Sequence, residues 1–132
     1  MMRFLLDANV VIALLNDTAS TLARRARRER PSDVAISSIV AHELFYGAFK
    51  SRRAAQNTAL VDALQFTVLE FDKEDARRAG EIRAYLAAKG TPIGPYDVLI
   101  AGQALARDMA LVTRNTREFR RVPGLRVENW EG

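Results

Sequence analysis

Short apolar runs alternate with longer helix-like segments along the whole chain, and this alternation constrains the fold more than any other feature. The apolar runs predict strands at residues 3–6, 34–36, 67–71, 111–113 and 127–130. The segments between them predict helices at residues 8–15, 18–30, 38–50, 53–65, 73–89 and 95–107. Alternating strands and helices form a parallel sheet covered on both faces. We therefore expect a three-layer α/β/α domain with a mostly parallel sheet of four to five strands.

The length and composition indicate one globular domain over residues 1–132. Its 132 residues have room for one core, and 48% of them are apolar. The sequence holds no cysteine, which excludes disulfides, thiolate zinc sites and cysteine nucleophiles. No apolar window approaches the length of a membrane span, and the N-terminus does not resemble a secretory leader. We expect a cytoplasmic protein without membrane contact.

The basic side chains are mostly arginines. The net charge is +4, and 17 of the 20 basic residues are Arg. Arginine grips phosphates in a bidentate way, which favours a polyanionic partner, but codon bias in a GC-rich genome gives the same composition. The arginines of residues 24–30 form either a solvated helix face or a contact for RNA or a protein partner.

Three carboxylates far apart in the sequence are expected at one edge of the sheet. Asp7 directly follows the first strand, although it also suits a helix cap. Asp97 lies in the first turn of an apolar helix, where the helix dipole alone favours it. Ligands in parallel sheets bind beyond the carboxyl ends of the strands, so we expect both side chains to face such a cleft.

Glu43 is expected on the inward stripe of the helix at residues 38–50. Ile39, Val40, Leu44 and Gly47 have the spacing of a buried helix face, and Glu43 falls among them. A buried carboxylate requires a partner, because desolvation of the charge costs several kcal/mol. That partner is either an arginine or a cation in the cleft.

A polar group follows the fourth strand at the same edge. It consists of Thr113, Asn115 and Glu118, which taken alone read as a turn and a solvated helix residue. Carboxylates brought together repel one another unless a cation neutralises them. Oxygen ligands without cysteine suit Mg²⁺ or Mn²⁺, and such an ion promotes phosphodiester hydrolysis.

Four segments of the chain resemble, in order, the motifs of PIN domains, and most closely those of VapC-type toxins of toxin–antitoxin pairs. They are Phe4-Leu5-Leu6-Asp7-Ala8-Asn9, Ser37-Ser38-Ile39-Val40-Ala41-His42-Glu43-Leu44-Phe45-Tyr46-Gly47, Gly94-Pro95-Tyr96-Asp97-Val98-Leu99-Ile100-Ala101 and Leu111-Val112-Thr113-Arg114-Asn115-Thr116-Arg117-Glu118-Phe119. The combination spans almost the whole chain.

This resemblance implies a Mg²⁺- or Mn²⁺-dependent endoribonuclease that cuts tRNA or another translation-related RNA and leaves a 5′-phosphate. It implies that Asp7 and Asp97 bind the metal, that Glu43 contributes nearby, and that Asn9 and Thr113 support the site. The family often has Thr or Ser where this chain has Ala8, and Asp where it has Asn115, so Glu118 is a candidate for the missing charge. It also implies a homodimer, a cognate VapB-like antitoxin, and DNA contact only through that antitoxin.

The helix at residues 38–50 also carries a histidine and three aromatic residues close to Glu43. Phe45, Tyr46 and Phe49 do not all fit the stripe that holds Glu43, so some should be exposed and could anchor the antitoxin. His42 should face away from the cleft, because neighbouring helix positions point about 100° apart.

Two other functions remain open at this point: a phosphoacceptor receiver-like domain and a non-catalytic RNA-binding module. The first needs an acidic pair after the first strand and a lysine after the last, and the lysines are only Lys50, Lys73 and Lys89. A carboxylate on a buried stripe argues against the second.

Overall fold

The computed structural model describes residues 2–131 and is built around five parallel strands. The strand order is β3-β2-β1-β4-β5. The strands are β1 (Phe4–Leu6), β2 (Val34–Ser37), β3 (Thr67–Leu69), β4 (Ala110–Val112) and β5 (Val127–Glu128). Each neighbouring pair is parallel, which confirms the predicted sheet and gives it five strands.

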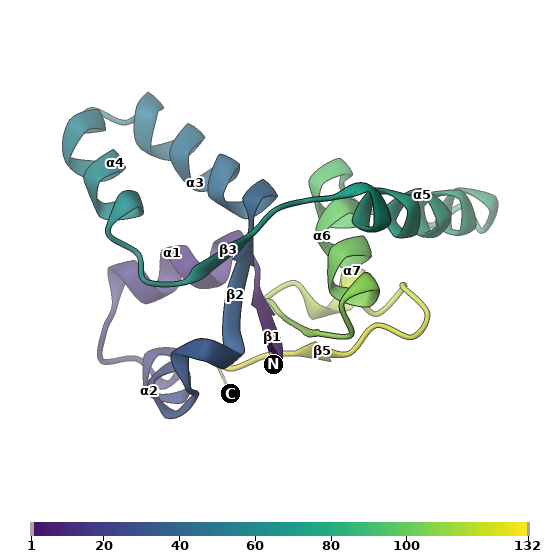
Figure 1. Cartoon of the computed structure of the whole chain (residues 1–132), viewed down its shortest axis with the longest axis horizontal. Helices are drawn as coiled ribbons and strands as arrows, with labels where there is room; N and C mark the ends of the chain where they lie inside the picture. Colours follow the sequence, from purple (N-terminus) through teal and green to yellow (C-terminus); the bar gives the residue numbers. More distant parts are fainter. Residues whose placement is uncertain (1, 132) are drawn as a thin grey trace.

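Helices cover both faces of the sheet (Figure 1). On one side lie α1 (Ala8–Asn16), α2 (Thr21–Arg28), α3 (Ser38–Lys50) and α4 (Ala54–Asp62), with a 3₁₀ turn at Pro31–Asp33. On the other side lie α5 (Lys73–Ala88), α6 (Pro95–Ala106) and the short α7 (Thr116–Phe119). These layers confirm the three-layer α/β/α architecture. Within residues 2–131, no helix combines the length and the apolar character needed to cross a membrane.

The central strand β1 places the expected site. All three of its residues are buried, and it pairs with β2 on one side and β4 on the other. Leu6 is in register with both Ile36 and Val112, so these three strands end at the same level. The residues that follow them therefore share one edge of the sheet, which we call the carboxyl edge.

Local hydrogen bonds shift some helix ends from their expected positions. Helix α2 begins at Thr21 rather than at residue 18, because the Ser20 hydroxyl accepts a hydrogen bond from the Ala23 N–H and caps the helix. Helix α4 ends at Asp62, three residues before the expected end. The short helix α7 contains Glu118, which the sequence suggested as a helix residue without giving the bounds of a helix. These differences leave the sheet and its order unchanged.

Close packing fixes α6 against α5. A Cβ atom on Gly102 would lie only 2.6 Å from the Ala79 backbone, so the two helices approach as closely as glycine permits. Beside this contact, Asp75 is 1% exposed and pairs with Arg107 at 3.0 Å. The Gln103 amide donates to Asp75 at 3.1 Å. The sequence did not predict this network. It holds α6, the helix whose first turn contains Asp97.

Candidate active site

Asp7 lies at the carboxyl edge, buried between β1 and α1. Its side chain is held from two sides: Oδ1 accepts from the Ala8 N–H at 2.8 Å, and Oδ2 accepts from the Thr113 hydroxyl at 2.8 Å. Burial raises the pKa of Asp7, and these two hydrogen bonds counter part of the rise. Asp7 is therefore both a helix cap and an oriented carboxylate, so the two interpretations from the sequence are compatible.

Glu43 is half-buried at the border of the buried face of α3. The fully buried positions are Val40, Leu44 and Ala48, whereas Gly47 is exposed. The predicted stripe was thus wrong at Gly47, because the helix turns its inward face one residue further along. The Oε1 atom of Glu43 is buried without a hydrogen-bond partner among the described residues. Burial raises the pKa of Glu43, and the charges of Asp7 and Asp97 raise it further.

Asp97 lies in the first turn of α6, as expected, and is half-buried. Burial raises its pKa to about 6, with further contributions from Asp7 and Glu118. A Cβ atom on Gly94 would lie 3.2 Å from the Asp97 Oδ2 atom. A side chain at position 94 would therefore crowd this carboxylate. The sequence offered Gly94 only as the first residue of the third PIN-like segment, and this role was not predicted.

Of the group that follows β4, Thr113 has the most direct contact with the site. It is fully buried, and its hydroxyl donates to Asp7 while accepting from the Asn115 N–H at 3.0 Å. The Asn115 side chain makes no capping hydrogen bond to α7, although the residue is in the N-cap position. Glu118 lies near enough to raise the pKa of Asp97. The structure thus brings this group to the same edge as Asp7.

The electrostatics of the carboxyl edge fit a cation. Among residues 2–131, no arginine or lysine forms an ion pair with Asp7, Glu43 or Asp97, and each of the three pKa values is raised. A second buried oxygen without a partner, Asn9 Oδ1, lies in the first turn of α1. The oxygens of Glu43 and Asn9 that lack a hydrogen-bond partner are of the kind that Mg²⁺ and Mn²⁺ take as ligands.

The carboxylates do not close into a tight ligand cage. Within the described part of the chain, no three His, Cys, Asp or Glu side chains converge closely enough to hold one ion together. An ion here would need water among its ligands, as Mg²⁺ usually retains.

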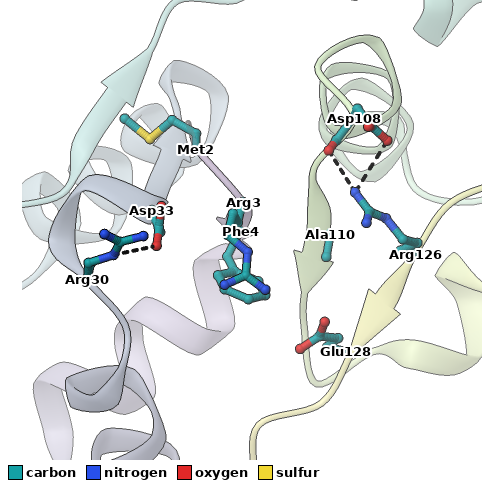
Figure 2. Close-up of a pocket in the computed structure, with 9 residues that line it drawn as sticks. All are labelled: Met2, Arg3, Phe4, Arg30, Asp33, Asp108, Ala110, Arg126 and Glu128. Atoms are coloured by element: carbon teal, nitrogen blue, oxygen red, sulfur yellow. Dashed lines mark hydrogen bonds and ion pairs between the residues drawn. The ribbon is translucent and has the colours of Figure 1, made fainter.

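The opposite edge of the sheet has a pocket of about 390 Å³ with a different charge arrangement (Figure 2). There, Arg30 pairs with Asp33 at 3.4 Å, and Arg126 pairs with Asp108 at 3.3 Å (Figure 2). The acidic groups in these two pairs each have a basic partner, which distinguishes them from Asp7.

The three aromatic residues proposed to bind a partner all lie on α3. Tyr46 and Phe49 are 61% and 68% exposed, which confirms that some of them are on the surface, and Phe45 is half-buried. None of them lines the nearby apolar groove of about 300 Å³ between α1, α3 and α4. That groove is lined instead by side chains that include Ile12, Leu15, Glu43, Leu60 and Val61.

His42 and Tyr96 contact each other beside the carboxylates. His42 is exposed, as expected for a residue pointing away from the cleft, and its ring centroid lies 5.5 Å from that of Tyr96. The sequence offered an aromatic residue next to Asp97, but its partner on another helix was not predicted. Trp130, by contrast, is buried and packs edge-on against Phe4 at 5.1 Å.

Comparison with known proteins places this geometry in a family. Residues 4–125 match the PIN domain. The chain belongs to the PIN-domain family. The tRNA(fMet)-specific endonuclease VapC of Salmonella typhimurium is 43% identical over 132 residues, covering 98% of this chain and 99% of that protein. The protein of the same description from Shigella flexneri is 40% identical with the same coverage. This membership excludes the receiver-like interpretation.

Solved structures agree with the family assignment. A chain of the DNA-bound VapBC complex from Salmonella typhimurium superposes with a TM-score of 0.93 at 43% identity, covering 98% of this PIN domain and 99% of that chain. A chain of VapBC2 from Rickettsia felis, bound to a promoter DNA fragment, gives a TM-score of 0.90 at 34% identity, with the same coverage. The resemblance stated from sequence motifs is confirmed.

Proposed function

We propose that this PIN domain is a metal-dependent endoribonuclease toxin of the VapC type, with its active site at the carboxyl edge. The observation that carries the proposal is the group of Asp7, Glu43 and Asp97. Burial raises the pKa of each, the charge of Asp7 raises the pKa values of Glu43 and Asp97 further, and no cationic side chain among the described residues pairs with them. Natural proteins avoid such an arrangement unless a bound cation neutralises it. The VapC relatives, which are named as ribonucleases, support the same activity.

In the proposed site, Asp7 and Asp97 bind Mg²⁺ or Mn²⁺ directly, and Glu43 acts through a water molecule. The ion, when bound, acidifies the attacking water and neutralises the charge that grows on the phosphate. Thr113 orients Asp7 through its hydroxyl, and Asn9 offers an unpartnered oxygen beside it. Asn115 and Glu118 fill the fourth acidic position between them, with Asn115 as a neutral carbonyl donor and Glu118 as the charge.

The proposed substrate is tRNA, cut in the cytoplasm. Two relatives that align over 98% of this chain are described as tRNA(fMet)-specific, and both exceed the identity of the other VapC ribonucleases compared. With water as the nucleophile and the 3′ oxygen as the leaving group, the cut would leave a 5′-phosphate and a 3′-hydroxyl, as the resemblance to PIN domains implies. Sequencing the 5′ ends of cellular RNA after induction of the protein identifies the RNA and the cut position.

The proposed partner is a VapB-like antitoxin, and DNA is contacted only through it. The structural relatives are toxin–antitoxin complexes, some of them on DNA. The apolar groove suits a partner helix, because Ile12, Leu15 and Leu60 are each at least 40% exposed there. Glu43 lies at the same groove, so a partner seated in it also reaches the acidic cluster. Tyr46 and Phe49, outside the groove, remain candidates for further antitoxin contacts or for a homodimer interface.

Cleavage with and without metal tests the proposed activity. The purified protein should cut tRNA in Mg²⁺ and stop in excess EDTA. Asp97→Asn should lose more than about 100-fold in rate, because it removes the charge of a direct metal ligand. Asp108→Asn is the matched control, since Asp108 lies at the opposite edge with a side chain that is 98% exposed. Full activity of Asp97→Asn, or cleavage that persists in EDTA, would contradict the assignment.

Expression in the native host tests the toxin role separately. The wild type alone should arrest growth, and Asp7→Ala should not. Tagged Asp7→Ala protein should retain a small partner that co-purifies in fixed proportion. If expression of the wild type is harmless and no small partner co-purifies, the toxin role is contradicted. That result leaves the nuclease activity untouched.

A further inference from the structure

Two aromatic rings stand at the rim of the acidic cluster, one from each of the helices that carry Glu43 and Asp97. Tyr96 is 46% exposed in the first turn of α6, and exposed His42 lies in α3. Their ring centroids are 5.5 Å apart and their planes are inclined by 57°. The rings therefore touch at an angle and do not stack flat, which leaves much of the Tyr96 ring open to solvent.

The aromatic residues and the carboxylates occupy neighbouring positions on the same two helices. Glu43 directly follows His42, and Asp97 directly follows Tyr96, so both pairs bridge the same contact between α3 and α6. Adjacent positions on a helix point about 100° apart, so each ring lies on the flank of the carboxylate that follows it. A group held by the rings is therefore next to the acidic cluster and not inside it.

This neighbourhood suits a nucleotide better than it suits a bare phosphate. The carboxylate side offers a place for the scissile phosphate with its metal, and the aromatic side offers a flat apolar surface. In RNA a base and its phosphate are joined through a single sugar. Aromatic rings also hold a base without adding positive charge, whereas an arginine at this rim would pair with the carboxylates and compete with the metal.

We propose that Tyr96, backed by His42, stacks on a nucleobase next to the scissile phosphate and so positions the RNA for cleavage. This inference rests on the proposed ribonuclease function. Tyr96 is a substrate-binding residue in this account, and His42 is a positioning residue that limits how the Tyr96 ring tilts. Stacking tolerates any base, so the pair sets where the chain is held rather than which sequence is cut.

A cycle between protein and substrate tests the stacking. The probes are short RNA oligonucleotides that span the mapped cut site, with each nucleotide in turn replaced by an abasic one. The wild type, Tyr96→Ala and Tyr96→Phe are compared in Mg²⁺ for kcat and KM. Tyr85→Ala is the matched control, because Tyr85 is similarly exposed at 42% but lies on α5 beside Lys89.

The expected result is a loss for Tyr96→Ala of about 5- to 150-fold in kcat/KM, carried mainly by KM. Tyr96→Phe, which keeps the ring, should recover most of what Tyr96→Ala loses, and Tyr85→Ala should stay close to the wild type. For one position beside the cut, the abasic substrate should lower the kcat/KM of the wild type by the same factor. The same substrate should cause no further loss of kcat/KM in Tyr96→Ala. That lack of additivity identifies a direct contact even if Tyr96→Ala is less stable.

Two results overturn the inference. In one, Tyr96→Ala cleaves the intact RNA as well as the wild type and loses only the affinity for a protein partner, which makes the rim a docking surface. In the other, Tyr96→Ala loses the same factor on intact and abasic substrates at every position. Neither result contradicts the ribonuclease assignment. That assignment is tested instead by the activity of Asp97→Asn and by the effect of EDTA on cleavage.

Discussion

Two buried aspartates in this fold have opposite surroundings. Asp75 is 1% exposed and meets the guanidinium of Arg107 and the amide of Gln103. Asp7 is 6% exposed, accepts hydrogen bonds from one hydroxyl and one backbone N–H, and lies near enough to Glu43 and Asp97 to raise their pKa values. No cationic side chain among the described residues pairs with it. The first arrangement is complete within the chain, and the second lacks its counter-charge.

The difference separates a structural role from a functional one. A buried carboxylate with its own arginine ties two helices together and needs nothing from solution. A buried cluster without one stores repulsion that folding of the chain alone does not relieve, and a bound cation relieves it. The unpaired cluster is therefore the site, and the paired network is the support that fixes α6 behind it.

Removal of Arg107 should give the largest effect on stability. Arg107→Ala leaves Asp75 buried and uncompensated, which should cost about 3 kcal/mol of the free energy of unfolding. Urea denaturation measures this loss. Arg126→Ala is the control, because its exposed pair with Asp108 should contribute less than about 1 kcal/mol. Equal losses in the two variants would show that the buried network is no different from a surface pair.

Neutralising one aspartate in each region should move stability in opposite directions. In EDTA at pH 7, Asp97→Asn should raise the free energy of unfolding by about 1 kcal/mol, because it removes a half-buried charge and, with it, the repulsion with Asp7 and Glu118. Asp75→Asn should lower it, because it removes the partner of Arg107. Thermal unfolding of both variants without metal decides the point, and a loss of stability in Asp97→Asn would contradict the stored repulsion.

The metal-free protein should also lose stability as pH rises. Asp97 titrates near 6 in the folded chain and near its ordinary 3.8 when unfolded, so the folded state binds more protons between these values. Stability therefore falls across about pH 4 to 6, by about 1 kcal/mol after allowance for the solvent exposure of Asp97. Unfolding titrations in EDTA should show this slope, and Asp97→Asn should flatten it. An equal slope in both proteins assigns the effect to other groups.

The fourth position should give the smallest changes. Asn115→Asp should tighten Mg²⁺ binding a few-fold by adding a charge to the site, and Glu118→Gln should loosen it by a similar factor. Calorimetric titration of both variants measures the affinities. Unchanged affinity in each would place both residues beyond the reach of the ion.

Parts of this contrast were predictable from the sequence, for local reasons. Asp7 and Asp97 stand where a strand ends and where a helix begins, and both signals lie within a few neighbouring residues. Glu43 was placed on the right helix, but the phase was wrong at Gly47, because Gly47 and Ala48 are both small and the periodicity does not distinguish them.

The network of Asp75, Gln103 and Arg107 was not predictable in the same way. Asp75 lies 28 residues before Gln103 and 32 before Arg107, and no period links an aspartate on one helix to an arginine at the end of another. A single glutamine inside an otherwise apolar helix was the one available signal. The contact of His42 with Tyr96 was not predicted for the same reason, because it depends on how α3 and α6 cross.

The central claim is that the unpaired cluster is completed by a cation, and a crystal grown with Mn²⁺ tests it most directly. The anomalous difference map should show a peak between the carboxylates of Asp7 and Asp97, with oxygen ligands close to 2.1–2.2 Å and water filling the remaining positions. The same crystal of Asp97→Asn should lack the peak or show it much weakened. A wild-type map without manganese at the carboxyl edge, or with manganese only at the pocket of the opposite edge, would contradict the account.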